Sequence, residues 1–418
     1  MAKLSEILKE RGYVYQHSSE KLAEITDGKK RTLYLGIDPS ADSLQVGQLQ
    51  AFLILRRFIE DGHKVILLVG GGTGMIGDPG GRSDERNLLD AETVERNAEA
   101  ISSQVKQLLG DADFTLANNA QWLEKLSMIE FLRDVGKHFS VNAMLQRDFV
   151  KERVKNVEEG ISYTEFSYAL LQAYDFLHLH QEYGADLQVG GSDQWGNIVS
   201  GVDFIRRKTG DAVYAFTWPL LVNKATGKKF GKSEQGTVWL DPAKTTPFQF
   251  YQFWLNVEDE TVEEYLLKMT MLSGVEIEAA MEMQKRDPKE RGAQQLLARE
   301  VTTLVHGEEV ATVAEKVSGV LFGDMGLTQL EESELSILRS TAPSHEVQVD
   351  SAVVDVLVST KLASSKREAR QFLKDKAVIL NNEVIKDEKR KLEASDFHNG
   401  IALLKRGRRN VCVLTLST

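Results

Sequence analysis

Side chains that could bind a charged ligand gather between Tyr34 and Gln48, where the sequence reads YLGIDPSADSLQVGQ. The apolar run 33–37 has the length and composition of a buried strand. Asp38-Pro39 then imposes a turn, because proline fixes its own φ and has no N–H to donate. The polar side chains of this stretch are therefore expected at the end of a strand.

A helix is expected directly after this turn. Apolar residues recur at helical spacing from Leu49 onward, and Asp42 or Ser43 is suited to cap the N-terminus. The free N–H groups and the dipole of a helix start favour anions. The stretch therefore predicts either a phosphate site or the ordinary strand–helix junction of any α/β protein.

Two further glycine-rich segments follow apolar runs. Residues 70–74, GGGTG, come after the run 63–69, and residues 190–197, GGSDQWGN, come after the run 186–189. Glycine allows a backbone to approach a ligand or another strand closely. The first segment lacks both the Gly-Lys-Ser/Thr ending of a P-loop and the spacing of a dinucleotide fingerprint, so alone it supports neither kind of site.

The segments that position these residues alternate between strand and helix patterns. Strands are expected at 33–37, 63–69, 114–117 and 186–189, and helices within 84–109, 128–139 and 161–179. This alternation indicates an α/β fold with a Rossmann-like, doubly wound parallel sheet. The expected domains are an α/β domain over 1–225, a loop at 226–245, a helical domain over 246–325, a linker at 326–349 and a small α+β module over 350–418.

The composition, with 42% hydrophobic and 27% charged residues, is that of an ordinary globular protein. No window has the roughly 18 apolar residues that a transmembrane helix needs, and the charged start MAKLSEILKERG is unlike a signal peptide. The single cysteine, Cys412, excludes an intrachain disulfide and a multi-cysteine zinc site, and it fits a cytoplasmic location.

The net charge of −11 argues against nucleic-acid binding over the whole surface, but the charge is uneven. Residues 350–418 carry 14 Lys and Arg against 9 Asp and Glu. A basic end on an acidic body indicates either a nucleic-acid partner bound at that end or an ordinary solvated surface.

The polar motifs occur in one order along the chain. They are the junction Tyr34–Gln48, Gly77-Asp78, Tyr168-x-x-x-Gln172-x-x-Asp175, Gly191-Ser-Asp-Gln-Trp-Gly-Asn197 and Lys229-Phe-Gly-Lys-Ser233. This set closely resembles the bacterial tyrosyl-tRNA synthetases, which are class I aminoacyl-tRNA synthetases, and the resemblance extends over essentially the whole chain. It implies a cytoplasmic homodimer that activates L-tyrosine with ATP and transfers it to the 3′-terminal adenosine of tRNA-Tyr. It further implies Mg²⁺ on the ATP phosphates, no tightly bound metal and no membrane association.

The resemblance also assigns a role to each domain. It implies a catalytic domain with the dimer interface over 1–225, a mobile KFGKS loop at 226–245, an anticodon-recognition domain over 246–325 and an RNA-binding module over 350–418.

For the amino-acid pocket, the resemblance implies that Tyr34 and Asp175 read the substrate phenol. A phenylalanine would leave both groups unpaired, at about 1–3 kcal/mol each, and this family is a standard example of such discrimination. Asp78, Tyr168 and Gln172 would hold the substrate ammonium group, with Gln188 and Gln194 near the ammonium and carboxylate ends. Without the resemblance, helix packing of Tyr168 and a surface amide at Gln172 would be the favoured interpretation.

For ATP, the resemblance implies close approach at Gly36, contacts with the nucleotide at Asp38 and Ser40, and stacking of the adenine on Gly47. Gly191 and Asp193 would accept the ribose hydroxyls. Lys229 and Lys232 would close on the β- and γ-phosphates as charge moves to the leaving pyrophosphate. Arg82 and Arg86 are candidates for the same clamp, although the family more often has lysine at the first position. A solvated helix charge is an equally good description of Arg86.

The chain departs from the family at the class I His-x-Gly-His signature, which here reads Gln45-Val46-Gly47-Gln48. A glutamine NH₂ can still donate to phosphate, but it is neutral and more flexible than an imidazole. If each lost contact costs roughly 0.5–2 kcal/mol, activation slows by one or two orders of magnitude without being abolished. Two alternatives remain: a tryptophan enzyme, against which Tyr34 and Asp175 argue, and a weak or inactive relative that acts as an RNA-binding protein.

The basic tail resembles the small RNA-binding module that this family shares with a ribosomal protein. Lys366, Arg367, Arg370 and Lys374 fall at near-helical spacing, and Lys405, Arg406, Arg408 and Arg409 form a second cluster that is expected in a turn. The resemblance implies that tRNA lies across both subunits of a dimer. Arg206, Arg207 and Lys208 either touch the acceptor stem or complement the dipole at the end of a helix.

Overall fold

The structure of the chain is a computed structural model that describes residues 2–78, 89–110, 112–155, 160–222, 230–233, 236–407 and 410–417. The chain divides into two compact units. The first unit contains residues 1–245 and 258–293, and the second contains residues 246–257 and 294–418. The helical region 246–325 that the sequence indicates as one domain therefore contributes to both units.

The first unit is built on a six-stranded sheet of order β1-β6-β5-β2-β3-β4. All neighbouring strands are parallel except β1 and β6. Four of the strands lie where the apolar runs predict them, which confirms the α/β class and the doubly wound parallel sheet, whereas those at 16–17 and 214–218 were not predicted. They are β1 (Gln16–His17), β2 (Thr32–Ile37), β3 (Lys64–Val69), β4 (Phe114–Asn118), β5 (Leu187–Gly191) and β6 (Tyr214–Trp218).

The order in which successive strands are added to the sheet reverses between β2 and β5, although these two strands are parallel. From β2 the chain proceeds outward through β3 and β4, whereas β5 leads outward in the opposite direction to β6. Ligands of such sheets bind at the carboxyl ends of the strands beside this switch point. The polar residues that follow β2, β3, β4 and β5 are therefore brought to one edge.

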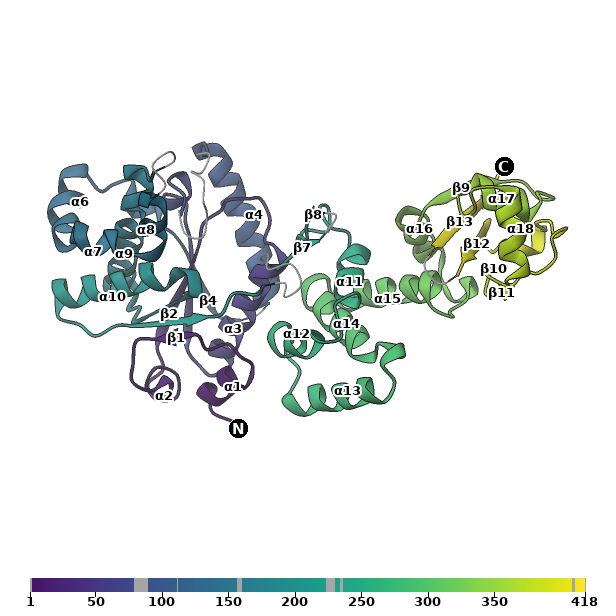
Figure 1. Cartoon of the computed structure of the whole chain (residues 1–418). Coiled ribbons are helices and arrows are strands. Elements are labelled where there is room, and N and C mark those ends of the chain that lie inside the picture. Colours follow the sequence, from purple (N-terminus) through teal and green to yellow (C-terminus); the bar gives the residue numbers. More distant parts are fainter. Residues whose placement is uncertain are drawn as a thin grey trace. The chain divides into compact units, whose positions relative to one another are not determined.

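Helices cover both sides of this sheet (Figure 1). On one side, Tyr34, Ile66 and Leu68 pack against Phe176 of α9 and Phe204 of α10. The alternation of side chains along a strand places these three strand residues on one face. The larger helices of the unit are α1 (Leu4–Glu10), α3 (Leu49–Glu60), α4 (Ala91–Leu109), α6 (Met128–Asp134), α8 (Asp148–Lys155), α9 (Tyr163–Tyr183), α10 (Trp195–Thr209), α12 (Val262–Met269) and α13 (Gly274–Arg286). Shorter helices are α2 (Leu22–Thr26), α5 (Ala120–Leu123) and α7 (Val141–Leu145).

The first strand–helix junction differs from the prediction at the helix start. A 3₁₀ turn, η1 (Val46–Gln48), precedes α3, so the helix begins at Leu49 and neither Asp42 nor Ser43 caps it. Asp42 instead pairs with Lys244 at 2.7 Å, and the Ser43 hydroxyl donates to the Leu44 carbonyl. The prediction was wrong because periodicity does not separate a 3₁₀ turn from the first turn of a helix.

The second unit contains a five-stranded sheet of order β11-β10-β12-β13-β9, with helices on both faces. Ala402 and Leu404 of β12 point toward α17 and α18, whereas Ile401 and Leu403 point toward α15 and α16. Figure 1 shows α16 and α18 on opposite sides of these strands. The strands are β9 (Ser344–Val347), β10 (Val378–Leu380), β11 (Glu383–Val384), β12 (Ile401–Arg406) and β13 (Asn410–Leu416).

The helices of the second unit fill the predicted linker as well. Residues 326–349 contain a helix and the edge strand β9, so this stretch belongs to the packed core rather than to a polar connection. The helices are α11 (Pro247–Leu255), α14 (Gly292–His306, apart from its first two residues), α15 (Glu308–Phe322), α16 (Glu332–Thr341), α17 (Val353–Ser359) and α18 (Lys366–Lys374).

Candidate active site

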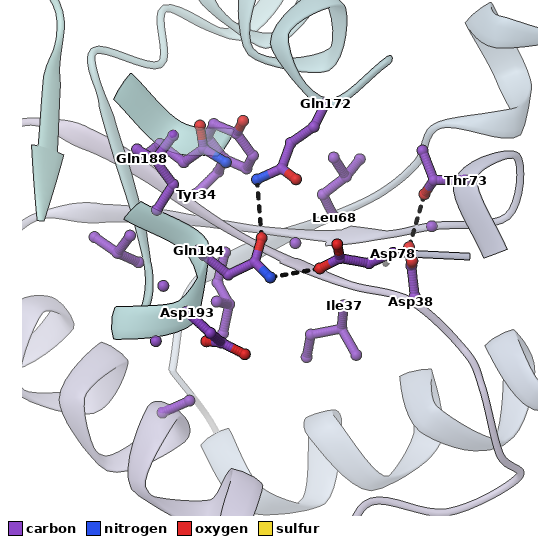
Figure 2. A pocket seen from close by; sticks show the side chains of 18 of the residues that line it. Tyr34, Ile37, Asp38, Leu68, Thr73, Asp78, Gln172, Gln188, Asp193 and Gln194 are labelled. Atoms are coloured by element: carbon purple, nitrogen blue, oxygen red, sulfur yellow. Dashed lines mark hydrogen bonds between the residues drawn. The ribbon is translucent and has the colours of Figure 1, made fainter. Parts of the chain in front are cut away.

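A cavity of about 310 Å³ lies at the carboxyl ends of β2 and β5, beside the switch point of the sheet. Figure 2 shows polar side chains converging on it from the strand ends and from α9. Most of the residues predicted for tyrosine and ATP line this one cavity. They are Tyr34, Gly36, Asp38, Ser40, Gly47, Gln48, Asp78, Tyr168, Gln172, Asp175, Gln188, Gly191, Asp193 and Gln194.

The buried end of the cavity is formed by Tyr34 of β2 and Asp175 of α9. Tyr34 is fully buried, and its ring lies 5.2 Å from the ring of Phe176. Within the described part of the chain, the Tyr34 hydroxyl and the Gln188 side-chain oxygen are buried without a hydrogen-bond partner. Buried polar groups are normally satisfied, so these two atoms indicate a ligand with polar groups at this end.

Asp175 is held by two donors that the motifs do not include. The side-chain amide of Asn119 donates to one carboxylate oxygen at 2.9 Å, and the indole N–H of Trp122 donates to the other at 2.7 Å. Burial nevertheless raises the pKa of Asp175 to about 7, with a smaller contribution from the charge of Asp38, because the two hydrogen bonds only partly offset desolvation. The carboxyl group is therefore poised to gain a further donor.

A second polar group lies midway along the cavity, around Asp78. The Gln194 side-chain amide donates to Asp78 at 2.5 Å and its oxygen accepts from the Gln172 amide at 3.3 Å (Figure 2). The Tyr168 hydroxyl donates to Asp38 at 2.7 Å. Burial, together with the nearby carboxylates, raises the pKa of Tyr168 well above its ordinary value, so it remains a donor at neutral pH. The carboxylates and amide oxygens here suit a cationic group.

The glycine-rich segment 70–74 serves the packing of polar side chains around the cavity. A Cβ at Gly70 would lie 2.1 Å from a carboxylate oxygen of Asp38, and one at Gly71 would lie 2.2 Å from the Asn118 side-chain oxygen. Neither a P-loop nor a dinucleotide fingerprint is needed to explain these glycines, because any side chain would displace residues that shape the cavity.

A chain of hydrogen bonds through Thr73 and Asn119 connects Asp38 with Asp175. The Thr73 hydroxyl donates to Asp38 at 2.7 Å, and the Asn119 amide donates to Thr73 at 2.9 Å as well as to Asp175. The Asn119 oxygen accepts the backbone N–H of Gly72 at 2.8 Å. Sequence reasoning gave Thr73, Asn119 and Trp122 no role. Thr73 lies in the glycine-rich segment 70–74, for which no site was assigned, and Asn119 and Trp122 belong to no motif. The available signal was the position of Asn119 just after the strand predicted at 114–117.

The open side of the cavity is lined by the signature segment. Gly47 and Gln48 line it, whereas Gln45 does not and instead forms an antiparallel bridge with Trp239. The side-chain oxygen of Gln48 accepts the backbone N–H of Gln45 at 2.9 Å, which leaves the Gln48 NH₂ as the group available to a ligand. A Cβ at position 47 would lie 3.1 Å from the Phe230 carbonyl oxygen, so glycine is needed there for the loop as well.

Several predicted residues lie outside the described ranges. These are Arg82, Arg86 and Lys229 of the expected phosphate clamp, and Arg408 and Arg409 of the basic tail. Lys232 belongs to β7 (Lys232–Ser233), whose backbone pairs with β8 (Gly236–Thr237).

Comparisons with known proteins agree with this geometry. A family model described as tRNA synthetases class I (W and Y) matches residues 26–323, and one for a tyrosine–tRNA ligase SYY-like C-terminal domain matches residues 334–414. The tyrosine–tRNA ligase of Roseiflexus castenholzii is 46% identical over 100% of both chains. The chain belongs to the tyrosine–tRNA ligase family. The ligase of Limosilactobacillus fermentum is 45% identical over 96% of this chain and 97% of its own.

Solved structures of the family also resemble the chain. A C-terminally truncated mitochondrial tyrosyl-tRNA synthetase of Aspergillus nidulans is 32% identical, with a TM-score of 0.68, over 75% of this chain and 93% of its own. Family membership, together with the cavity, makes the site a candidate class I synthetase active site.

The predicted basic residues of the C-terminal part divide into two groups. Lys366, Arg367, Arg370 and Lys374 are exposed on α18, although Arg370 and Lys374 lie 3.7 and 3.5 Å from the carboxylate of Glu388. Lys405 and Arg406 lie in β12 rather than in a turn. Lys405 is only 4% exposed and donates to the carbonyls of Val320 and Gly323 at 2.9 and 3.2 Å. The expectation that Lys405 belongs to an exposed cluster was therefore wrong.

The basic residues at the end of α10 make contacts within the chain. Arg206 and Arg207 both pair with Asp203 at 2.5 Å. Arg207 also donates to the His138 carbonyl at 3.0 Å, and Lys208 donates to the Asp134 carbonyl at 3.1 Å. These contacts join α10 to α6 and the turn after it. A contact with the acceptor stem stays a prediction.

The described part of the chain shows neither a metal-binding cluster nor a membrane-spanning helix. No group of three or more His, Cys, Asp or Glu side chains in the described ranges is arranged to hold a metal ion. Among the helices of these ranges, none is long and apolar enough to cross a membrane.

Proposed function

We propose that the protein is a tyrosine–tRNA ligase. It joins L-tyrosine to the adenylate group of ATP with release of pyrophosphate, and it then transfers the tyrosyl group to the 3′-terminal adenosine of tRNA-Tyr. The observation that carries this proposal is the unpartnered Tyr34 hydroxyl beside the buried carboxyl of Asp175 at the closed end of the cavity. A substrate phenol satisfies both, because its hydroxyl donates to the carboxylate and accepts from Tyr34.

The middle of the cavity holds the substrate ammonium. Asp78 now accepts from the NH₂ of Gln194, and an ammonium group replaces that donor with a stronger, charged one. Tyr168 and Gln172 border the same position. With both ends held, the tyrosine carboxylate points toward the open side, where Gly36, Gly47 and Asp193 would receive ATP.

The chemical step is in-line attack of a tyrosine carboxylate oxygen on the α-phosphorus. The bond from that phosphorus to the bridging oxygen of the β-phosphate breaks, and pyrophosphate leaves with the electron pair. Positioning and electrostatic stabilisation supply the catalysis, since no proton transfer is required. The Gln48 NH₂, Lys229 and Lys232 would donate to the phosphates, with Arg82 and Arg86 as further candidates. Mg²⁺ would arrive bound to those phosphates, because Mg²⁺ is typically held by substrate oxygens in such sites.

We infer a cytoplasmic homodimer, and an exposed apolar surface on the first unit supports the second copy. Met128 and Ile129 of α6 are 71% and 72% exposed. Large exposed apolar surfaces are typical of protein–protein interfaces. The other exposed members of this surface are Leu132, Val141, Leu145, Val154 and Tyr163.

The tRNA would be held by the second unit, with the exposed face of α18 on the phosphate backbone. We propose that the helical region 246–325 recognises the anticodon and that residues 350–418 bind RNA. Arg367 and Arg406 extend this basic face, and the Arg406 guanidinium also lies 5.0 Å from the ring centre of Phe372. Arg408 completes the predicted set.

Two rival functions make different predictions about the amino acid. The indole N–H of a tryptophan substrate can donate to Asp175 but offers no acceptor to the Tyr34 hydroxyl, so tryptophan accounts for the buried end of the cavity less well than a phenol does. An inactive relative that only binds RNA would rest on Gln45 and Gln48 alone. The Gln48 NH₂, however, is still available to a ligand at the cavity wall.

Amino-acid-dependent exchange of labelled pyrophosphate into ATP separates these functions. We expect exchange with tyrosine but not with phenylalanine or tryptophan, and an increase of about 10- to 100-fold in Gln45→His/Gln48→His. Exchange with tryptophan alone would establish the rival enzyme. Absence of exchange in the protein, with recovery in the double variant, would favour the RNA-binding function.

A further inference from the structure

Residues 238–240 form backbone hydrogen bonds with Leu44 and with Val46 of the signature segment. The N–H of Val46 donates to the Val238 carbonyl at 3.0 Å, and the N–H of Leu240 donates to the Leu44 carbonyl at 2.9 Å. The backbone N–H of Val238 also donates to the carbonyl of Gly231 at 2.8 Å. The described part of the loop thus rests on the residues that precede α3.

Glycine at positions 47 and 231 permits this close approach. The Phe230 carbonyl lies over Gly47, as described above, and a Cβ at Gly231 would lie 2.7 Å from a methyl carbon of Val46. Gly231 also has a φ of +94°, which other residues rarely adopt. The backbone of Phe230 and Gly231, which precede Lys232, is therefore in close contact with Val46 and Gly47.

On the other side, the loop is held by an aromatic contact outside the cavity. The ring of Phe230 lies 4.7 Å from the ring of Tyr265 on α12, with an angle of 39° between the planes. Both side chains are buried. Neither Tyr265 nor Phe230 belongs to the cavity lining, but the carbonyl of Phe230 lies beside Gly47, which does.

The helix that carries Tyr265 is itself anchored by the N-terminal segment. The buried guanidinium of Arg11 donates to the carbonyls of Leu267 and Thr270 at 2.7 and 2.8 Å, and also to that of Leu272. The Tyr13 hydroxyl donates to the Lys268 carbonyl at 2.9 Å. A cation at the carbonyl end of a helix satisfies free acceptors and complements the dipole.

We propose that Tyr265 is a positioning residue for the catalytic loop, and that Arg11 acts through it by fixing α12. Tyr265 packs against Phe230 and so holds the backbone of residues 230–232 beside Gly47, at the open side of the cavity. This inference rests on the proposed function. Since cations on the leaving group act in the transition state, the contact raises kcat and leaves tyrosine binding unchanged.

The test compares Tyr265→Leu with Tyr265→Phe in tyrosine-dependent pyrophosphate exchange. Tyr265→Leu removes the ring contact, and we expect kcat to fall about three- to tenfold with an unchanged KM for tyrosine, the size of one aromatic pair. Tyr265→Phe keeps the ring and should retain kcat within about twofold. Arg11→Met should show the same fall in kcat at an unchanged KM.

The matched control is Tyr251→Leu, which removes another buried tyrosine ring, from α11 in the second unit. It should lower Tm without the selective fall in kcat. An unchanged kcat in Tyr265→Leu would overturn the proposal, as would an equal loss in Tyr251→Leu or a loss in Tyr265→Phe as large as in Tyr265→Leu. If the unsubstituted protein shows no exchange at all, the proposed function fails instead.

Discussion

The side-chain amide of Asn119 donates a hydrogen bond to the carboxyl group of Asp175 at 2.9 Å. The Asn119 oxygen is occupied by the backbone N–H of Gly72, so its NH₂ must face Asp175 and Thr73. The orientation of the group that would read the substrate phenol is therefore set by the backbone of the glycine-rich segment.

Asn119→Ala should weaken the discrimination between tyrosine and phenylalanine. A hydrogen bond to a charged group contributes about 1.5–3 kcal/mol, so kcat/KM for tyrosine should fall about 10- to 100-fold while that for phenylalanine changes little. The control is Asn118→Ala, whose side-chain oxygen accepts the N–H of Ala120 and which makes no contact with Asp175 in the described structure. Equal selectivity in the two variants would contradict the assigned role.

Tyrosine affinity should increase as the pH rises toward 7. The pKa of Asp175 is about 7 in the free protein, chiefly because of burial, so much of it is protonated at pH 6. A substrate hydroxyl donates to the ionised form, which lowers this pKa and releases a proton on binding. Calorimetry between pH 6 and 8 should detect tighter tyrosine binding with rising pH and none of this gain for phenylalanine. A tyrosine affinity independent of pH would rule out this linkage.

Gln48 should act as a phosphate donor that does not titrate. Its oxygen accepts the N–H of Gln45 at 2.9 Å, which directs its NH₂ to the cavity. Gln48→Ala should lower kcat for exchange roughly three- to tenfold, the effect of one lost hydrogen bond. Gln48→His should raise kcat and add a dependence on pH near 6.5, the ordinary pKa of histidine. If Gln48→Ala is as active as the parent, the contact with phosphate does not exist.

Lys405 and Arg367 should affect different properties although both are basic residues of the tail. Lys405→Met leaves the buried carbonyl of Val320 unsatisfied and removes the donor from the partly buried carbonyl of Gly323, so the second unit should lose about 1–3 kcal/mol of unfolding free energy. Arg367→Gln should leave Tm unchanged and reduce the slope of log K for tRNA against log salt by about 1. A reduced salt slope in Lys405→Met, measured where it is folded, would restore Lys405 to the RNA-binding face.

Much of the fold follows from local sequence patterns. The strands at 32–37, 64–69, 114–118 and 187–191 could be predicted because each is a short apolar run bounded by polar or turn residues. The cavity residues could be predicted as a set because they stand in motifs at the ends of those strands, and parallel strands bring such ends to one edge.

Residues that act through tertiary contacts were not predictable in this way. Asn119 and Trp122 support Asp175 across more than 50 residues of sequence, and no local pattern records that pairing. Residues 258–293 join the first unit through carbonyls that Arg11 caps, a contact between distant segments. The burial of Lys405 could have been predicted, because Lys405 follows Ile401 and Leu403 at alternate positions that face one side of the sheet.

The most direct test of the central proposal is aminoacylation of tRNA-Tyr by the full-length protein with labelled tyrosine and ATP. We predict an alkali-labile ester on the 3′-terminal adenosine that depends on ATP, is not formed from phenylalanine or tryptophan, and is strongly reduced in Asp175→Ala. Charging with tryptophan, or no charging by a folded protein that still binds the tRNA, would contradict the assignment of this cavity as a tyrosine-activating site.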